Sequence, residues 1–178
     1  MRILLPLLLL ITVTAQAAGP GKNAVASAHP LATDAGMEIL AKGGNAYDAA
    51  IAVAAALAVV EPYSAGMGGG GFWLLHRESD GLQTFVDARE TAPDAAIPTM
   101  YQDRDGKVVR DWALNGPSAA GIPGQAAAFV HLADNYGKLP LKTSLAPAIR
   151  LAKDGFEVEA HYRKLAGYRE DGLNRFPE

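Results

Sequence analysis

The organisation of this chain is decided by the stretch Glu61-Pro62-Tyr63-Ser64-Ala65-Gly66-Met67-Gly68-Gly69-Gly70-Gly71-Phe72-Trp73-Leu74-Leu75-His76. An apolar helical run ends at its proline, four consecutive glycines follow, and an aromatic and aliphatic strand begins at Phe72. Phosphate-binding loops have the opposite order, with a strand before the glycines and a helix after them. The order here disfavours nucleotide binding, and we interpret the glycines as a turn where backbone closely approaches backbone or ligand.

Three elements are predicted on the amino-terminal side of the glycines. Pro30 suits the first position of a helix, and Gly43-Gly44 suits its end. Asn45 is a good N-cap for the next helix, and its almost unbroken Ala, Val, Ile and Leu content predicts burial on several sides. The predicted elements are an edge strand over Asn23–Ala28, a helix over Leu31–Lys42 and a helix over Ala46–Val60.

On the carboxyl-terminal side, the turn dipeptide Asp80-Gly81 predicts a hairpin. Residues 91–121 are rich in Pro, Gly and Asp and are predicted to form an ordered excursion. Amphipathic segments then follow, two of them stopped by glycine. The predicted elements are strands over Phe72–His76 and Leu82–Asp87 and helices over Gln125–Tyr136, Ser144–Asp154 and Glu159–Glu170.

The composition suits one globular domain and excludes several classes of function. The 178 residues are 49% hydrophobic with a net charge of -3, which argues against a nucleic-acid partner. The four histidines are scattered and there is no cysteine, so neither a metal site nor a disulfide is predicted.

The segment Asp103–Gly106 lacks the closing glutamate of a calcium loop and is predicted to be a turn. Ser64 lies outside any nucleophile elbow.

The first 17 residues predict a signal peptide. Met1-Arg2 is positively charged, Ile3–Val13 is apolar, and Ala15-Gln16-Ala17 offers small residues for cleavage after Ala17. A stable membrane anchor is the alternative, but spanning a bilayer takes roughly 20 apolar residues. A periplasmic or secreted mature chain over residues 18–178 is therefore expected.

Arg89-Glu90, after the second predicted strand, is the candidate binding pair. A planar guanidinium at a strand end can grip a carboxylate through two parallel hydrogen bonds. The alternative is a structural ion pair, which is the more common arrangement.

Seven segments run in order through essentially all of the predicted mature chain. They are Val25–Ala32, Gly43–Ala50, Glu61–Phe72, Asp87–Pro93, Gly121–Gly124, Tyr136–Pro140 and Leu145–Ala152. Together they resemble the γ-glutamyltransferase (γ-glutamyltranspeptidase, glutathione hydrolase) family, specifically the amino-terminal part of its large subunit.

The resemblance implies an α+β fold, as an incomplete part of the αββα sandwich of N-terminal-nucleophile hydrolases. It implies a precursor that cleaves itself into large and small subunits, and an N-terminal threonine of the small subunit that forms an acyl-enzyme. The implied substrates are glutathione and other γ-glutamyl compounds, with water, an amino acid or a peptide as acceptor, and no cofactor is implied. Arg89 matches the arginine that binds the α-carboxylate of the glutamyl group. Glu90 matches a neighbour that arranges the α-amino end or supports the arginine.

The catalytic threonine of the family opens a Thr-Thr-His-type motif, which these 178 residues do not contain. We therefore expect no catalytic residue here, no activity from this portion alone, and bare sheet edges where strands are missing. Two alternatives remain. One is a related acylase acting on a β-lactam side chain or on polyglutamate, which Arg89 disfavours. The other is a non-catalytic remnant or binding protein ending at Glu178.

Overall fold

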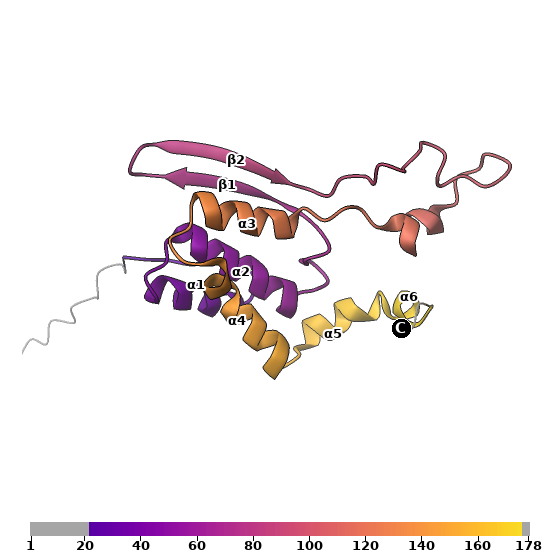
Figure 1. Ribbon diagram of the computed structural model, residues 1–178. Helices are drawn as coiled ribbons and strands as arrows, with labels where there is room; N and C mark the ends of the chain where they lie inside the picture. Colours follow the sequence, from indigo (N-terminus) through magenta and orange to yellow (C-terminus); the bar gives the residue numbers. More distant parts are fainter. Residues whose placement is uncertain (1–21, 176–178) are drawn as a thin grey trace, which may run out of the picture.

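The computed structural model describes residues 22–175, which form a helical core, a β-hairpin, a long arm and a pair of C-terminal helices (Figure 1). The predicted signal peptide, residues 1–17, lies outside the described residues. Within residues 22–175, none of the helices has the length and apolar character needed to cross a bilayer.

The core is built on two helices, α1 (Pro30–Ala41) and α2 (Ala46–Val60), and both were predicted within one residue. Their facing side chains are small or branched, which allows close packing, and Ile39 and Ile51 are completely buried. The edge strand predicted over residues 23–28 is wrong. The segment has no strand beside it, and its Val25 packs instead near Gly36 and Val53 of the two helices.

The amino-terminal end of α2 is fixed by a capping box that also ties it to a distant loop. The Asn45 side chain accepts hydrogen bonds from the backbone of Tyr47 and Asp48, and the Asp48 carboxylate accepts one from the backbone N–H of Asn45. The fully buried Asp48 also accepts hydrogen bonds from the backbone N–H groups of Lys138 and Leu139, at 3.0 and 3.3 Å. One carboxylate thus satisfies three backbone donors from two parts of the chain.

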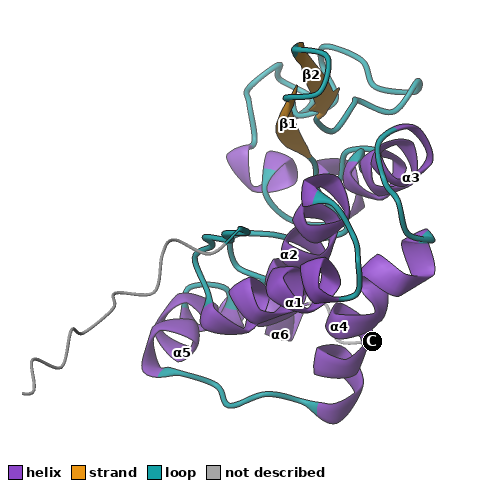
Figure 2. Ribbon diagram, turned by 90° about the vertical axis from the view of Figure 1, so that its left-hand side faces the viewer, coloured by secondary structure: helices purple, strands orange, loops and turns teal. Residues whose placement is uncertain are grey.

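The predicted hairpin is present as β1 (Gly71–Arg77) and β2 (Leu82–Ala88), which pair antiparallel. One face packs on the helices, where the Trp73 ring meets Phe129 edge-on at 5.9 Å. The outer face carries Phe72, Leu74 and Phe85, whose exposed fractions are 58%, 83% and 56%. Figure 2 shows the hairpin on one side of the helical core. A single two-stranded sheet with helices on one side matches the predicted incomplete α+β sandwich.

Four further helices follow the arm: α3 (Gln125–Asn135), α4 (Leu141–Asp154), α5 (Ala160–Gly167) and α6 (Glu170–Arg175). The prediction started α4 three residues late, at Ser144. Ser144 lies inside the helix, where it is fully buried, and Pro140 occupies the cap position. The last predicted helix, over Glu159–Glu170, ends earlier, at Gly167, and a separate helix, α6, begins at Glu170.

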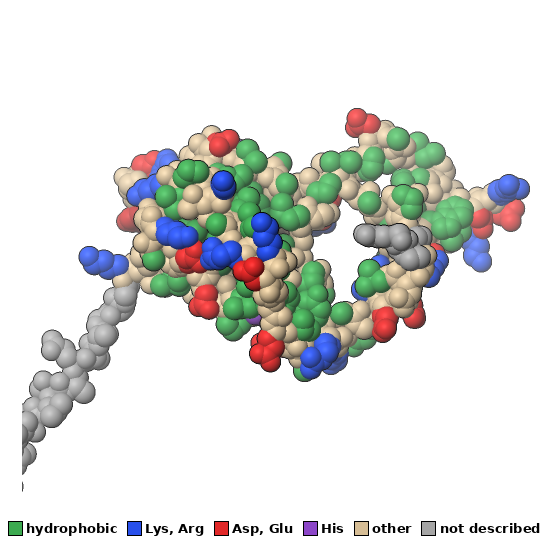
Figure 3. Space-filling view, turned by 60° about the horizontal axis from the view of Figure 1, so that its bottom comes forward, with side chains coloured by type: hydrophobic (Ala, Val, Ile, Leu, Met, Phe, Trp, Pro, Cys, Tyr) green, Lys and Arg blue, Asp and Glu red, His purple; other side chains and the backbone are tan. Residues whose placement is uncertain are grey.

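The arm, residues 92–121, is the predicted excursion and contains two short 3-10 helices, η1 (Arg110–Ala113) and η2 (Pro117–Ala119). Its base is closed by a bridge between Thr91 and Ile122. Its far part reaches α6 through an ion pair between Asp111 and Arg175. Figure 3 shows an opening framed by the arm and the C-terminal helices. The arm is therefore held at its base and near its tip rather than packed along the core.

Candidate functional site

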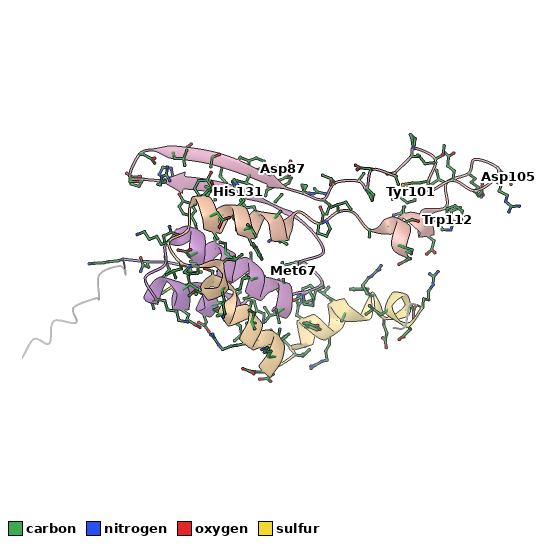
Figure 4. All side chains as sticks on the ribbon, in the orientation of Figure 1. Met67, Asp87, Tyr101, Asp105, Trp112 and His131 are labelled. Atoms are coloured by element: carbon green, nitrogen blue, oxygen red, sulfur yellow. The ribbon has the colours of Figure 1, made fainter. Side chains whose placement is uncertain are left out.

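The predicted binding pair lies where β2 ends and the arm begins. Arg89 directly follows β2, and the bridge between Thr91 and Ile122 comes two residues later. The glycine turn before β1 and the segment before α3 meet at the same point, because the Gln125 N–H donates to the carbonyl of Gly69. In Figure 4, Met67 marks the loop that enters β1 and Asp87 marks the end of β2. Three chain segments thus converge on Arg89 and Glu90.

Close backbone approach explains the glycines at this junction. A Cβ atom on Gly70 would lie 2.2 Å from the carbonyl oxygen of Ala88, and a Cβ on Gly124 would lie at the same distance from the same oxygen. Contacts below 3.0 Å to backbone cannot be relieved by rotating a side chain. The predicted close approach of backbone in the glycine turn is confirmed at Gly70, and Gly124, from the segment before α3, approaches the same residue, Ala88.

We expect Gly70→Ala to destabilise the protein by about 1–3 kcal/mol, because the new methyl group would force the backbone away from Ala88 and Arg89. The matched control is Gly68→Ala in the same loop, where a Cβ would have no neighbour within 4 Å. Thermal unfolding of the full-length protein measures both. Equal melting temperatures for the two variants would contradict the close approach.

Glu90 is held as a carboxylate beside the arginine. Its Oε2 accepts a hydrogen bond from Arg89 Nε at 3.1 Å, and its side chain is one-third exposed. Its own backbone N–H, then Arg89, and then the backbone of Gly70 lower the pKa of Glu90 below its ordinary 4.5. The carboxyl group is therefore ionised at neutral pH.

The backbone and the side chain of Arg89 both have neighbours that orient them, and the side chain remains accessible to solvent. Its N–H donates to Asp87 Oδ1 at 2.9 Å, and its guanidinium carbon lies 5.7 Å from the centre of the Phe72 ring. The side chain is 62% exposed. Within residues 22–175, only Nε of the guanidinium has a hydrogen-bond acceptor, so both terminal nitrogens can meet an anion.

The two interpretations of this pair are therefore compatible. The structural ion pair between Arg89 and Glu90 exists, but it uses only Nε of the guanidinium. The side chain is 62% exposed, so its two terminal nitrogens are available to a ligand. Sequence reasoning allowed a structural pair of the arginine with an Asp or a Glu, but it did not predict the backbone hydrogen bond to Asp87 or the contact with Phe72. The Asp two residues before Arg89 is a signal for such a turn, whereas the Phe72 contact depends on strand register.

The other residues considered for chemistry have structural surroundings. His29 caps α1, where its Nδ1 accepts the N–H of Leu31 at 3.2 Å. Asp103 accepts from the backbone of Asp105 and Lys107, which confirms the turn predicted there. Across the described part of the chain, no three His, Cys, Asp or Glu residues are grouped so that they could hold a metal ion.

Comparison with known proteins gives consistent matches. The family model described as Gamma-glutamyltranspeptidase matches residues 32–178. The chain is 45% identical over 134 residues to the glutathione hydrolase proenzyme of Escherichia coli K12, a match that covers 75% of this chain and 23% of that protein. The chain spans about a quarter of the length of the curated relatives it matches.

Solved structures share the fold. The gamma-glutamyltranspeptidase of Helicobacter pylori matches with a TM-score of 0.85 at 34% identity, covering 90% of this chain and 46% of that one. The cephalosporin acylase of Bacillus halodurans matches with a TM-score of 0.72 at 30% identity, covering 94% of this chain and 32% of that one. The observed hairpin and helices are thus a substructure of larger proteins of this type.

Proposed function

Because this chain belongs to the gamma-glutamyltranspeptidase family, we propose that it is the amino-terminal part of an enzyme that transfers or hydrolyses γ-glutamyl groups, with Arg89 binding the α-carboxylate of the donor. The observation that carries the proposal is the exposed, two-pronged end of Arg89, oriented by its neighbours. A carboxylate meets such a fork through two parallel, charge-assisted hydrogen bonds.

The proposed chemistry divides between this chain and a downstream part. The N-terminal threonine of a small subunit attacks the γ-amide carbonyl, the amine leaves, and an acyl-enzyme forms. Water, an amino acid or a peptide then takes the acyl group and releases the threonine. Arg89 contributes by holding the α-carboxylate end of the glutamyl group, which positions the reacting γ-carbonyl at its other end against the threonine. The residues of this chain supply binding rather than bond cleavage.

The maturation of the protein is part of the same proposal. Residues 1–17 act as a cleaved signal peptide and place the enzyme in the periplasm or outside the cell. Residues 18–178 belong to the large subunit, whose partner is the small subunit released by self-cleavage. Amino-terminal sequencing of the mature large subunit should begin at Ala18. A mature chain that retains Met1 would contradict the signal peptide.

The experiment that tests the function begins with the coding region downstream of Glu178 and continues with the full-length product. We expect a Thr-Thr-His motif there, self-cleavage of the product, and release of amine from glutathione or a γ-glutamyl anilide. The 178-residue chain expressed alone should be inactive.

Two other outcomes would support the alternatives. Turnover of a β-lactam side chain or of polyglutamate without γ-glutamyl activity would support a related acylase. A stop codon after Glu178 would support a remnant or binding protein.

Replacing Glu90 by glutamine should raise KM for the γ-glutamyl donor by about three- to tenfold at neutral pH, because the charge beside Arg89 is lost. The pKa of Glu90 is lowered, so its contribution is complete above pH 4.5 and is lost only as the pH falls through the lowered value. KM measured against pH should show the wild type and the variant converging below pH 4.5. Glu78→Gln, at an almost fully exposed carboxylate in the hairpin turn, is the control. Convergence already at neutral pH would refute this role of Glu90.

A further inference from the structure

Phe72, the second residue of β1, faces the guanidinium of Arg89. The Arg89 Cζ atom lies 5.7 Å from the centre of the Phe72 ring, within the roughly 6 Å at which a cation is attracted to an aromatic face. Strand pairing creates the contact, because Phe72 is the register partner of Asp87. The side chains of register partners emerge on the same face of a hairpin, and Arg89 follows two residues after Asp87.

Arg89 is therefore restrained at three different points. Asp87 accepts its backbone N–H, Glu90 accepts its Nε–H, and the Phe72 ring lies 5.7 Å from its guanidinium carbon. A long arginine side chain has many rotamers, and fixing one of them on binding costs conformational entropy. Contacts that exclude rotamers before the ligand arrives therefore lower the entropy cost of binding. Within residues 22–175, the hydrogen bond of the guanidinium to Glu90 uses Nε, so the two terminal nitrogens can still meet a carboxylate.

We infer, on the basis of the carboxylate-binding function proposed for Arg89, that Phe72 is a positioning residue that presents the guanidinium to the α-carboxylate of the donor. Its aromatic character is the property that matters. An aliphatic side chain at this position would fill the same face of the hairpin but would not attract the cation.

Phe85 provides a matched control on the same surface. Its ring centre lies 5.4 Å from that of Phe72, and its exposed fraction, 56%, is close to the 58% of Phe72. Among the described residues, the cation–π contact of Arg89 is made by Phe72 and not by Phe85. Loss of either ring removes a similar apolar side chain, but only one loss removes the contact with Arg89.

The experiment compares Phe72→Leu, Phe72→Tyr, Phe85→Leu and Arg89→Ala in the full-length, self-cleaved enzyme. Two donors are used, a γ-glutamyl anilide and the same compound with its α-carboxylate converted to a carboxamide. The readout is the ratio of kcat/KM for the two donors, which reports recognition of the carboxylate independently of the amount of folded enzyme. Phe72→Leu should lower this ratio by about two- to fivefold, mainly through KM. Phe72→Tyr keeps an aromatic ring and should keep the ratio at its wild-type value, and Phe85→Leu should also leave the ratio unchanged.

The outcomes separate the positioning role from the function on which it rests. If Arg89→Ala abolishes the preference for the carboxylate while Phe72→Leu leaves it intact, the role of Phe72 is overturned and that of Arg89 stands. Equal losses in Phe72→Leu and Phe85→Leu would also overturn it, because the effect would then belong to the apolar face. If Arg89→Ala keeps the preference, the proposed function falls as well. Should Phe72→Leu fail to mature, Phe72→Met replaces it in the same comparison.

Discussion

Replacing Arg89 by alanine in the full-length enzyme is expected to lower kcat/KM for a γ-glutamyl donor by about 100-fold, with most of the loss in KM. Under the proposed role of Arg89, two charge-assisted hydrogen bonds to the α-carboxylate are lost together. Each hydrogen bond to a charged group is worth about 1.5–3 kcal/mol, of which exposed groups realise the lower part. The loss should appear in steady-state kinetics and should vanish for a donor without an α-carboxylate.

Two further substitutions make this result specific. Arg89→Lys keeps the charge but loses the planar fork, so it should recover only part of the affinity. Arg77→Ala removes another arginine of the hairpin, one whose Nε and terminal nitrogen are both bound to Asp80, at 2.9 and 2.7 Å. It should leave KM unchanged, because that fork is already occupied. An Arg89→Ala enzyme with wild-type KM would remove Arg89 from the substrate site.

The largest loss of stability is expected from Asp48→Ala, at about 3–5 kcal/mol. The substitution leaves the backbone N–H groups of Asn45, Lys138 and Leu139 without their acceptor, and each buried donor without an acceptor costs about 1–3 kcal/mol. Thermal unfolding and soluble yield of the full-length protein measure the loss. Asp48→Asn should be intermediate, since one amide oxygen can still accept.

The control for Asp48 is Asp34→Ala, which removes an exposed carboxylate from the neighbouring helix α1. Surface substitutions of this kind usually change stability by no more than about 0.5 kcal/mol. If the two alanine variants unfold at the same temperature, the carboxylate of Asp48 does not connect α2 to the loop after α3.

Local signals in the sequence were sufficient for some elements and not for others. The bounds of α2 followed from Asn45 and Pro62, because a cap and a proline act on their immediate neighbours. The start of α4 did not, because its first residue, Leu141, follows Pro140 and has no capping side chain before it to mark the boundary. The residues 23–28 failed as a strand because a strand requires a partner, and pairing is not a local property.

The same distinction applies to the site. Arg89 and Glu90 could be selected from their place after a strand and from resemblance, and the structure shows them joined by a hydrogen bond. The contact with Phe72 required the register of the hairpin, which the turn dipeptide alone left undetermined. The close approach of Gly70 and Gly124 to the carbonyl oxygen of Ala88 could not be predicted, because it depends on how three separate chain segments are placed in space.

The hydrogen bonds of Asp48 also close a long loop of the chain. Its hydrogen bond to Lys138 joins positions separated by 90 residues, with the whole hairpin and arm between them. A contact between such distant positions forms only when the residues between them have been brought together, and closing a loop of this length costs conformational entropy. Until Lys138 and Leu139 reach α2, the buried acid has its local cap at Asn45 but lacks these two donors. We therefore expect this contact to form late in folding.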